Sequence, residues 1–287
     1  IGEITMSSFL FGAATSAHQV EGQNIHNDWW AWEKAGRVRE ASGDACNHYE
    51  YFEKDLELAA KLGHNAHRFS LEWSRLEPQP GQWNEEAFDH YEKVFQKLKN
   101  LGLEPIVTLH HFTNPSWFAE KGGWENPANI PDYLCYIQKV LEAFAPYVRY
   151  WVTFNEPVVY LYYGYLEGTW PPGKKDFSLA LKVFRNLLNA HIESYRLIHR
   201  HYRRLPQSEV FVSIAKHMLY FSPWREHVLS DQIAASLRHC FFNEVFLRAL
   251  HRGFLFFPGI FCEALSGERT LDFIGLSFNF LGFLSTM

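Results

Sequence analysis

The sequence predicts an α/β fold of the (β/α)8-barrel type, incomplete, with about six βα units in a single domain of residues 1–287. Strand-like and helix-like segments alternate along the 287 residues, the order expected of a parallel sheet with right-handed crossovers. Glycines follow several of the predicted helices, where chains commonly leave a helix. Six units exceed what a small doubly wound domain needs, whereas a complete barrel has eight.

The predicted strands are short apolar runs, and the predicted helices carry apolar residues on one face. The strands are 9–14, 66–71, 105–109, 150–154, 210–215 and 273–278. The helices are 49–62, 85–101, 130–147, 179–202 and 231–250. We expect the first strand, 9–14, to be short and buried.

The fourth predicted strand ends in two polar residues, Asn155 and Glu156, which are followed by Pro157. Proline cannot donate to a sheet ladder, so the strand stops there. In a parallel barrel this end of a strand faces the mouth of the active site. Glu156 is therefore a candidate proton donor. The alternative is that it only caps the next helix, whose N-terminus favours a negative charge.

Composition limits the classes of function. Aromatic residues make up 17% of the chain, which fits a globular protein with a cleft that stacks sugars or rings, although most aromatics must lie in the core. The net charge is −5, and no basic stripe indicates a nucleic-acid partner. Four arginines at helical spacing are interpreted as a solvated helix face: Arg196, Arg200, Arg203 and Arg204.

The cysteines and the apolar runs favour a cytoplasmic protein without a membrane segment. Four cysteines lie far apart with no CxxC pair, which favours reduced thiols: Cys46, Cys135, Cys240 and Cys262. Residues 1–8 include an acidic residue and lack an apolar core of signal-peptide length. No apolar run approaches the ~20 residues that a membrane-spanning helix needs.

Five motifs follow one another at the ends of consecutive predicted strands. They are FLFGAATSAHQVEG at 9–22, RFSLEWSR at 68–75, TLHHFTNP at 108–115, TFNEP at 153–157 and DFIGL at 272–276. Together they resemble the family 1 glycoside hydrolases, β-glucosidases and β-galactosidases of (β/α)8 fold. The resemblance extends from about residue 9 to about residue 278.

The resemblance implies a role for each matching residue. Glu156 would be the general acid/base, whose pKa must lie above that of a free carboxylic acid for it to protonate a glycosidic oxygen at neutral pH. Asn155 would bind the sugar 2-hydroxyl, and Gln19 and His111 the other hydroxyls. Arg68 would orient the second carboxylate and keep it ionised. No cofactor is implied, and the substrate would be a small carbohydrate.

Structural alternatives remain for these residues. Gln19 could cap a loop, and Arg68 could form a buried ion pair. His110 and His111 are adjacent in a strand and point to opposite faces, so they are not expected to share a metal ion; His110 is expected in the core. Trp124 either lines the aglycone side of the substrate site or packs a loop.

Glu21 and Glu72 are interpreted as structural carboxylates. Retaining hydrolysis needs two carboxyl groups ~5–5.5 Å apart, and the resemblance would place the nucleophile in a TENG-type motif that this sequence lacks. Asn279 stands where the family has a tyrosine that bonds the nucleophile. An inverting pair of Glu156 and Glu72 is a minor alternative.

Three hypotheses therefore remain open for this 287-residue form. It is a β-glycosidase whose nucleophile comes from elsewhere, a catalytically inactive sugar-binding or interaction module, or a vestigial truncated product. Six barrel strands leave two open edges, and the segment 280–284 is very apolar. Such edges favour pairing with another chain, so we expect a homo-oligomer or a complementary chain to cover them.

Overall fold

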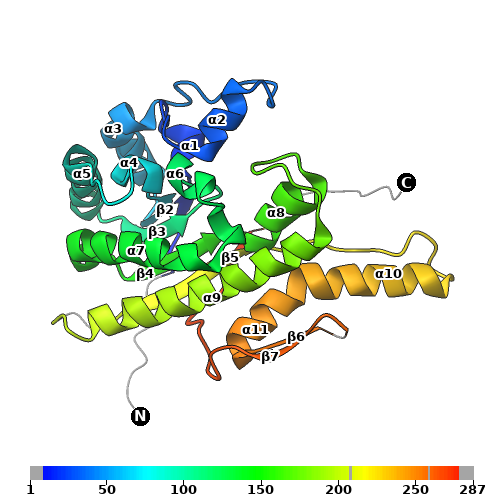
Figure 1. Ribbon diagram of the computed structural model, residues 1–287. Coiled ribbons are helices and arrows are strands. Elements are labelled where there is room, and N and C mark those ends of the chain that lie inside the picture. The colour runs from blue at the N-terminus through cyan, green and yellow to red at the C-terminus, as the bar shows by residue number, and fades with distance from the viewer. Residues whose placement is uncertain (1–8, 207–208, 258, 278–287) are drawn as a thin grey trace, which may run out of the picture.

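Six parallel strands form one sheet in the computed structural model, which describes residues 9–206, 209–257 and 259–277 (Figure 1). The strand order is β1 (Gly12–Ala14), β2 (Ala66–Ser70), β3 (Glu104–His110), β4 (Tyr150–Asn155), β5 (Phe211–His217) and β8 (Gly275–Ser277). This order follows the chain and confirms the predicted incomplete barrel of about six βα units. The carboxyl ends of all six strands therefore lie at one rim of the sheet.

The helices that follow the strands match the predicted ones closely. They are α3 (His48–Lys61), α5 (Glu85–Leu101), α7 (Ile130–Phe144) with the 3-10 turn η3 (Ala145–Tyr147), and α9 (Phe177–Tyr202). In α5, the Asn84 side chain accepts a hydrogen bond from the N–H of Ala87, which caps the first turn. Gly102 ends the helix with a positive φ of 68°, which glycine adopts without steric cost.

Further short helices occupy the connections at the carboxyl ends of the strands. These are α1 (Ala17–Val20), α2 (Asp28–Lys34), α4 (Trp73–Leu76), α6 (Ser116–Glu120) and α8 (Pro157–Leu161), with 3-10 turns η1 (Gly123–Glu125) and η2 (Pro127–Asn129) and the π-helical segment η4 (Tyr162–Glu167). They order the long loops that carry four of the five sequence motifs.

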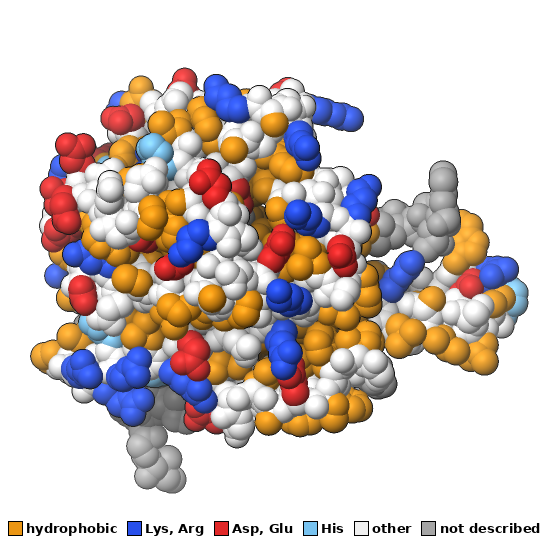
Figure 2. Space-filling view, viewed as in Figure 1, with side chains coloured by type: hydrophobic (Ala, Val, Ile, Leu, Met, Phe, Trp, Pro, Cys, Tyr) orange, Lys and Arg blue, Asp and Glu red, His pale blue; other side chains and the backbone are white. Residues whose placement is uncertain are grey.

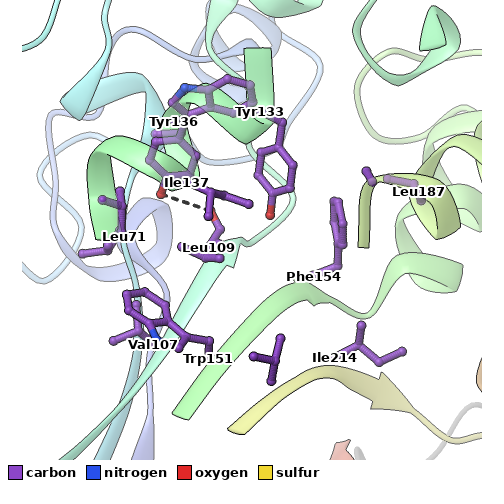
Figure 3. Packing of buried hydrophobic residues seen from close by; sticks show 14 of the residues in the cluster. Leu71, Val107, Leu109, Tyr133, Tyr136, Ile137, Trp151, Phe154, Leu187 and Ile214 are labelled. Atoms are coloured by element: carbon purple, nitrogen blue, oxygen red, sulfur yellow. Dashed lines mark hydrogen bonds between the residues drawn. The ribbon is translucent and has the colours of Figure 1, made fainter. Parts of the chain in front are cut away.

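The core lies between the middle strands and the helices that cover them (Figure 3). Trp151 of β4 and Val107 of β3 are paired in register and have no exposed surface. The Nε1 of Trp151 donates to the hydroxyl of Tyr202 on α9 at 2.9 Å, so the indole loses no hydrogen bond on burial. Strand β4 is thereby fixed to the helix behind it.

The C-terminal part differs from the prediction in two ways. The helix expected over 231–250 is divided into α10 (Leu229–His239), the π-helical segment η5 (Cys240–Val245) and α11 (Phe246–Arg252). An antiparallel hairpin of β6 (Phe254–Phe257) and β7 (Phe261–Ala264) precedes β8 and was not predicted. The run 254–257 alternates between exposed and buried residues, the pattern of a half-buried strand.

The expectation that the first strand is buried is wrong. All three residues of β1 are exposed, and Phe11 just before it is 54% exposed. At the other end of the sheet, Leu276 of β8 is 51% exposed. Both strands are edges of the described sheet, so each has a neighbour on one side only. Figure 2 also shows hydrophobic side chains on the projecting part where Figure 1 places α10, whose Leu229 and Leu237 are more than half exposed.

Two expectations fall outside the described residues, namely the role of Asn279 and the apolar segment 280–284. Within the part of the chain that the structure does describe, no helix combines the length and apolar character needed to cross a bilayer.

Candidate active site

Asn155 and Glu156 lie at the carboxyl end of β4, as expected from the proline that follows them. Asn155 is the last residue of the strand and is 4% exposed. Glu156 has φ 46° and ψ 56°, the left-handed conformation, and its N–H donates to the carbonyl of Ala215 on β5 at 2.8 Å. A residue other than glycine pays of order 1 kcal/mol or more there. This backbone conformation sets the direction in which the carboxyl group leaves the strand end.

Glu156 directly precedes α8 but does not cap it with its side chain. No side-chain hydrogen bond to the first turn of α8 is formed, and Pro157 takes the first helical position. The alternative that Glu156 serves only as a helix cap is therefore disfavoured. Its carboxylate instead lies near β5, where Glu156 Oε1 is 3.7 Å from the Nδ1 of His217.

Arg68, the third residue of β2, holds Asn155 in place. Its Nη2 donates to Asn155 Oδ1 at 2.6 Å, and its Nε donates to Thr108 Oγ1 of β3 at 3.0 Å. Burial lowers the pKa of Arg68 to about 10, against the opposing effect of the Glu156 charge, so the guanidinium stays charged at neutral pH. Because the Asn155 oxygen is used within the protein, a bound hydroxyl would meet its Nδ2 side.

His111 directly follows β3 and is less buried than its neighbour His110. Its Nδ1 is buried without a hydrogen-bond partner among the described residues. Burial, with the nearby charges of Arg68 and His110, lowers the pKa of His111 well below its usual value, so the ring is neutral and can accept or donate a hydrogen bond to a ligand. His110 is 3% exposed and packs against Trp124 and Phe154.

Gln19 lies on α1, in the connection after β1. Its side chain is exposed, and its Oε1 accepts from the hydroxyl of Ser16 at 2.5 Å. Strands β1 and β2 pair with Ala14 opposite Arg68, so α1 follows the strand next to the one that carries Arg68. Four consecutive strands, β1 to β4, thus each contribute one candidate residue, either from the strand itself or from the connection after it: Gln19, Arg68, His111 and Glu156.

Trp124 lies in the packed interior instead of on an open surface. It is 1% exposed, and its Nε1 donates to Asn114 Oδ1 at 2.8 Å. Its ring packs edge-on against Phe118 and Phe154. This placement favours the packing alternative that the sequence left open, because a sugar would find almost no Trp124 surface to contact.

Glu21 and Glu72 make internal bonds, in agreement with their interpretation as structural carboxylates. Glu21 accepts from Arg75 Nε at 3.0 Å and from the hydroxyl of Tyr91 at 2.7 Å. Burial outweighs both bonds and raises the pKa of Glu21 to about 7. Glu72 is 1% exposed and accepts from Ser74 and Thr113.

Sequence reasoning missed Lys216 and His217, which lie beside Glu156 at the carboxyl end of β5. Lys216 is 1% exposed, and its Nζ donates to the carbonyl of His217 at 2.9 Å and to that of Phe242. Burial lowers the pKa of Lys216 to about 7, and the Glu156 charge partly opposes this. Polar residues directly after an apolar strand were the available signal, but the predicted strand stopped at Ala215.

The described residues contain no group of three His, Cys, Asp or Glu side chains arranged to hold a metal ion. What the strand ends bring together is a carboxyl group, an arginine-held amide and a neutral imidazole. This set can donate a proton and hydrogen-bond hydroxyl groups.

A family model described as "Glycosyl hydrolase family 1" matches residues 3–269. The chain belongs to glycosyl hydrolase family 1. A beta-glucosidase A of Thermotoga maritima is 31% identical over 292 residues, and a cytosolic beta-glucosidase of Homo sapiens is 32% identical over 256 residues. These alignments cover 94% and 85% of this family 1 chain, but only 64% and 54% of the two relatives.

The fold of this family 1 chain is also that of solved family members. A beta-glycosidase from Pyrococcus horikoshii is 41% identical and superimposes with a TM-score of 0.85 over 93% of this chain and 60% of that one. A family 1 β-glucosidase from Thermotoga maritima gives a TM-score of 0.80 over 85% and 56%. The chain thus spans a little over half the length of these proteins.

Proposed function

We propose that this chain carries the acid/base half of a β-glycosidase site that hydrolyses terminal β-linked sugars, with β-glucosides as the first substrates to test. The observation that supports this best is Glu156, held in a strained conformation at the end of β4 beside an asparagine fixed by a buried arginine. The names of the relatives, several of them β-glucosidases, support the same class of substrate.

In the proposed reaction, Glu156 donates a proton to the glycosidic oxygen as the bond from that oxygen to C1 breaks. A second carboxylate attacks C1 from the opposite face and forms a glycosyl intermediate. Glu156 then takes a proton from the water that releases the sugar, so the configuration at C1 is retained. Asn155, His111 and Gln19 are proposed to bind the hydroxyls, and Arg68 to keep the second carboxylate ionised.

The second carboxylate is proposed to come from further barrel strands that pair with the edges β1 and β8. These strands would belong to a continuation of this chain, to another copy or to a complementary chain. The exposed apolar residues at both edges, among them Phe11 and Leu276, support such pairing. Pairing there would bring new strand ends to the rim that carries Glu156.

The experiment uses an aryl β-glucoside with the wild type and the Glu156→Gln variant, each with and without azide. Azide can replace an absent carboxylate nucleophile by forming the bond to C1, while Glu156 protonates the departing oxygen. The glucoside is one whose leaving group needs protonation, such as phenyl β-glucoside. With it we expect turnover by the wild type in azide, with α-glucosyl azide as product, and a large loss of turnover in the variant.

The outcomes separate the hypotheses. Turnover by the wild type without azide, lost in the variant, would mean that self-association already supplies a second carboxylate. Absence of turnover under all conditions would overturn the proposal. In that case binding of glucoimidazole, a ligand of the Thermotoga maritima enzyme, would identify a sugar-binding module instead.

A further inference from the structure

Asn114, in the connection between β3 and α6, is joined to Asp28 by three hydrogen bonds. The N–H and the Nδ2 of Asn114 donate to Oδ1 and Oδ2 of Asp28 at 2.9 and 2.8 Å. The Asp28 N–H donates to the carbonyl of Asn114 at 2.9 Å. Asp28 is the first residue of α2, so these bonds connect the loop after β1 to the loop after β3.

The side chain of Asn114 also binds two other parts of the site. Its Oδ1 accepts from Trp124 Nε1 at 2.8 Å and lies 3.1 Å from His110 Nε2. Its Nδ2 lies 3.3 Å from the hydroxyl of Tyr160 on α8. An indole N–H only donates and a carboxylate only accepts, so the partners fix which end of the amide is which. Asn114 is 2% exposed, which raises the cost of leaving any of these bonds unmade.

These contacts reach both proposed functional segments. Asn114 lies three residues after His111, and Tyr160 donates its N–H to the carbonyl of Glu156 at 3.1 Å. Between His111 and Asn114, Phe112 has a φ of +72°, which is rare for a residue with a side chain. A loop with such a residue persists only where its surroundings fix it. Phe112 packs edge-on against Trp170, and the bonds from Asp28 hold Asn114, two residues further on.

We propose that Asn114, held by Asp28, is a positioning residue that sets the His111 loop and the helix after Glu156 relative to each other. This inference rests on the proposed function, because it assigns a purpose to the spacing of those two segments. Asn114 itself does not touch the substrate. Its effect on sugar affinity passes through His111 and through the start of α8.

An exchange of the two side chains tests the proposal. Asp28→Asn places an amide donor against the Nδ2 donor of Asn114. Asn114→Asp places a second carboxyl group within about 3 Å of Asp28, whose pKa burial raises to about 7; the two cannot both be ionised, so the measurements are made at pH 8, where their repulsion is strongest. The double variant Asp28→Asn/Asn114→Asp restores a donor and an acceptor in reversed order. In it the carboxylate introduced at position 114 can still accept from the indole of Trp124 and can accept from the hydroxyl of Tyr160.

Two readouts are measured for the wild type and the three variants: the dissociation constant of glucoimidazole by calorimetry, and hydrogen exchange in peptides covering 111–115 and 157–161. We expect each single variant to lose at least tenfold in affinity and to lose protection in both peptides. The double variant should return to within about threefold of the wild type in affinity and should regain protection.

Tyr202→Phe is the matched control, because it removes buried hydrogen bonds at the opposite end of β4, where Tyr202 accepts from Trp151. It should lower stability without changing affinity or exchange in the two peptides. Sugar binding that neither single variant changes would overturn the positioning role and leave the proposed function intact. If the wild type binds no sugar but each single variant still loses protection in both peptides, the result would support the role of Asn114 and count against the proposed function.

Discussion

The middle and the edge of the sheet differ in what they can support. Strand β4 has neighbours on both sides, and its residues from Trp151 to Asn155 are buried. Strand β8 has one neighbour in the described sheet and leaves Leu276 half exposed. The strained Glu156 stands at the end of the enclosed strand. A precise polar site is thus built where packing on both sides fixes the backbone, whereas an edge strand keeps surface available for pairing.

The largest expected effect is the loss of stability on removing the central indole. Trp151→Ala should lower the free energy of unfolding by about 3–5 kcal/mol, because a fully buried aromatic side chain is deleted and a cavity remains. Leu276→Ala, on the edge strand, should change it by less than about 1 kcal/mol. Urea denaturation of both variants measures the difference. Similar losses at the two positions would contradict the distinction between enclosed and edge strands.

A second effect concerns the buried carboxyl group of Glu21. Its pKa is raised to about 7 in the folded protein from 4.5, so folding favours the protonated form. The stabilisation that results is fully present below pH 4.5 and is lost as the pH rises through 7. The variant Glu21→Gln does not titrate at this position. Relative to it, the free energy of unfolding of the wild type should therefore fall by up to roughly 3 kcal/mol between pH 4.5 and 8.

Urea denaturation of this pair of proteins at several pH values checks the sign. An advantage of the wild type over Glu21→Gln that grows with pH would mean that the Arg75 ion pair outweighs burial.

A third prediction uses the strain at Glu156. Glu156→Gly should raise the free energy of unfolding by about 1 kcal/mol, because glycine adopts the left-handed conformation without steric cost. Glu193→Gly, in the middle of α9, should lower it by about 1 kcal/mol. Thermal or urea unfolding compares the two. Destabilisation by Glu156→Gly would show that the conformation of Glu156 stores no strain.

The smallest effect on stability is expected at the edge. Leu276→Lys should change the free energy of unfolding by less than about 0.5 kcal/mol, since the side chain is already half exposed. It should nevertheless weaken any pairing through β8, because a charge on an edge strand opposes strand addition. Light scattering over a range of concentrations measures the mass of both proteins. Self-association that the variant leaves unchanged would place the interface elsewhere.

The sequence predicted the enclosed part of the fold better than its edges. Runs of apolar residues identified β2 to β5, and Pro157 placed Asn155 and Glu156 at a strand end. Lys216 and His217 were missed because their side chains are polar, although pairing with β8 extends β5 to include them. The expectation that β1 is buried was wrong because an apolar sequence does not reveal whether a strand has neighbours on both sides. The contacts that bury Trp124 are set by tertiary packing, which its local sequence does not encode.

The most direct test of Glu156 as proton donor is the dependence of azide-assisted turnover on the leaving group. A weakly acidic alcohol as leaving group needs protonation, whereas 2,4-dinitrophenolate departs without it. We expect the turnover rate of Glu156→Gln to fall about 10²–10⁴-fold with the first kind of β-glucoside and to change little with the second. An equal loss with both, or no loss with either, would contradict the assignment of Glu156 as general acid.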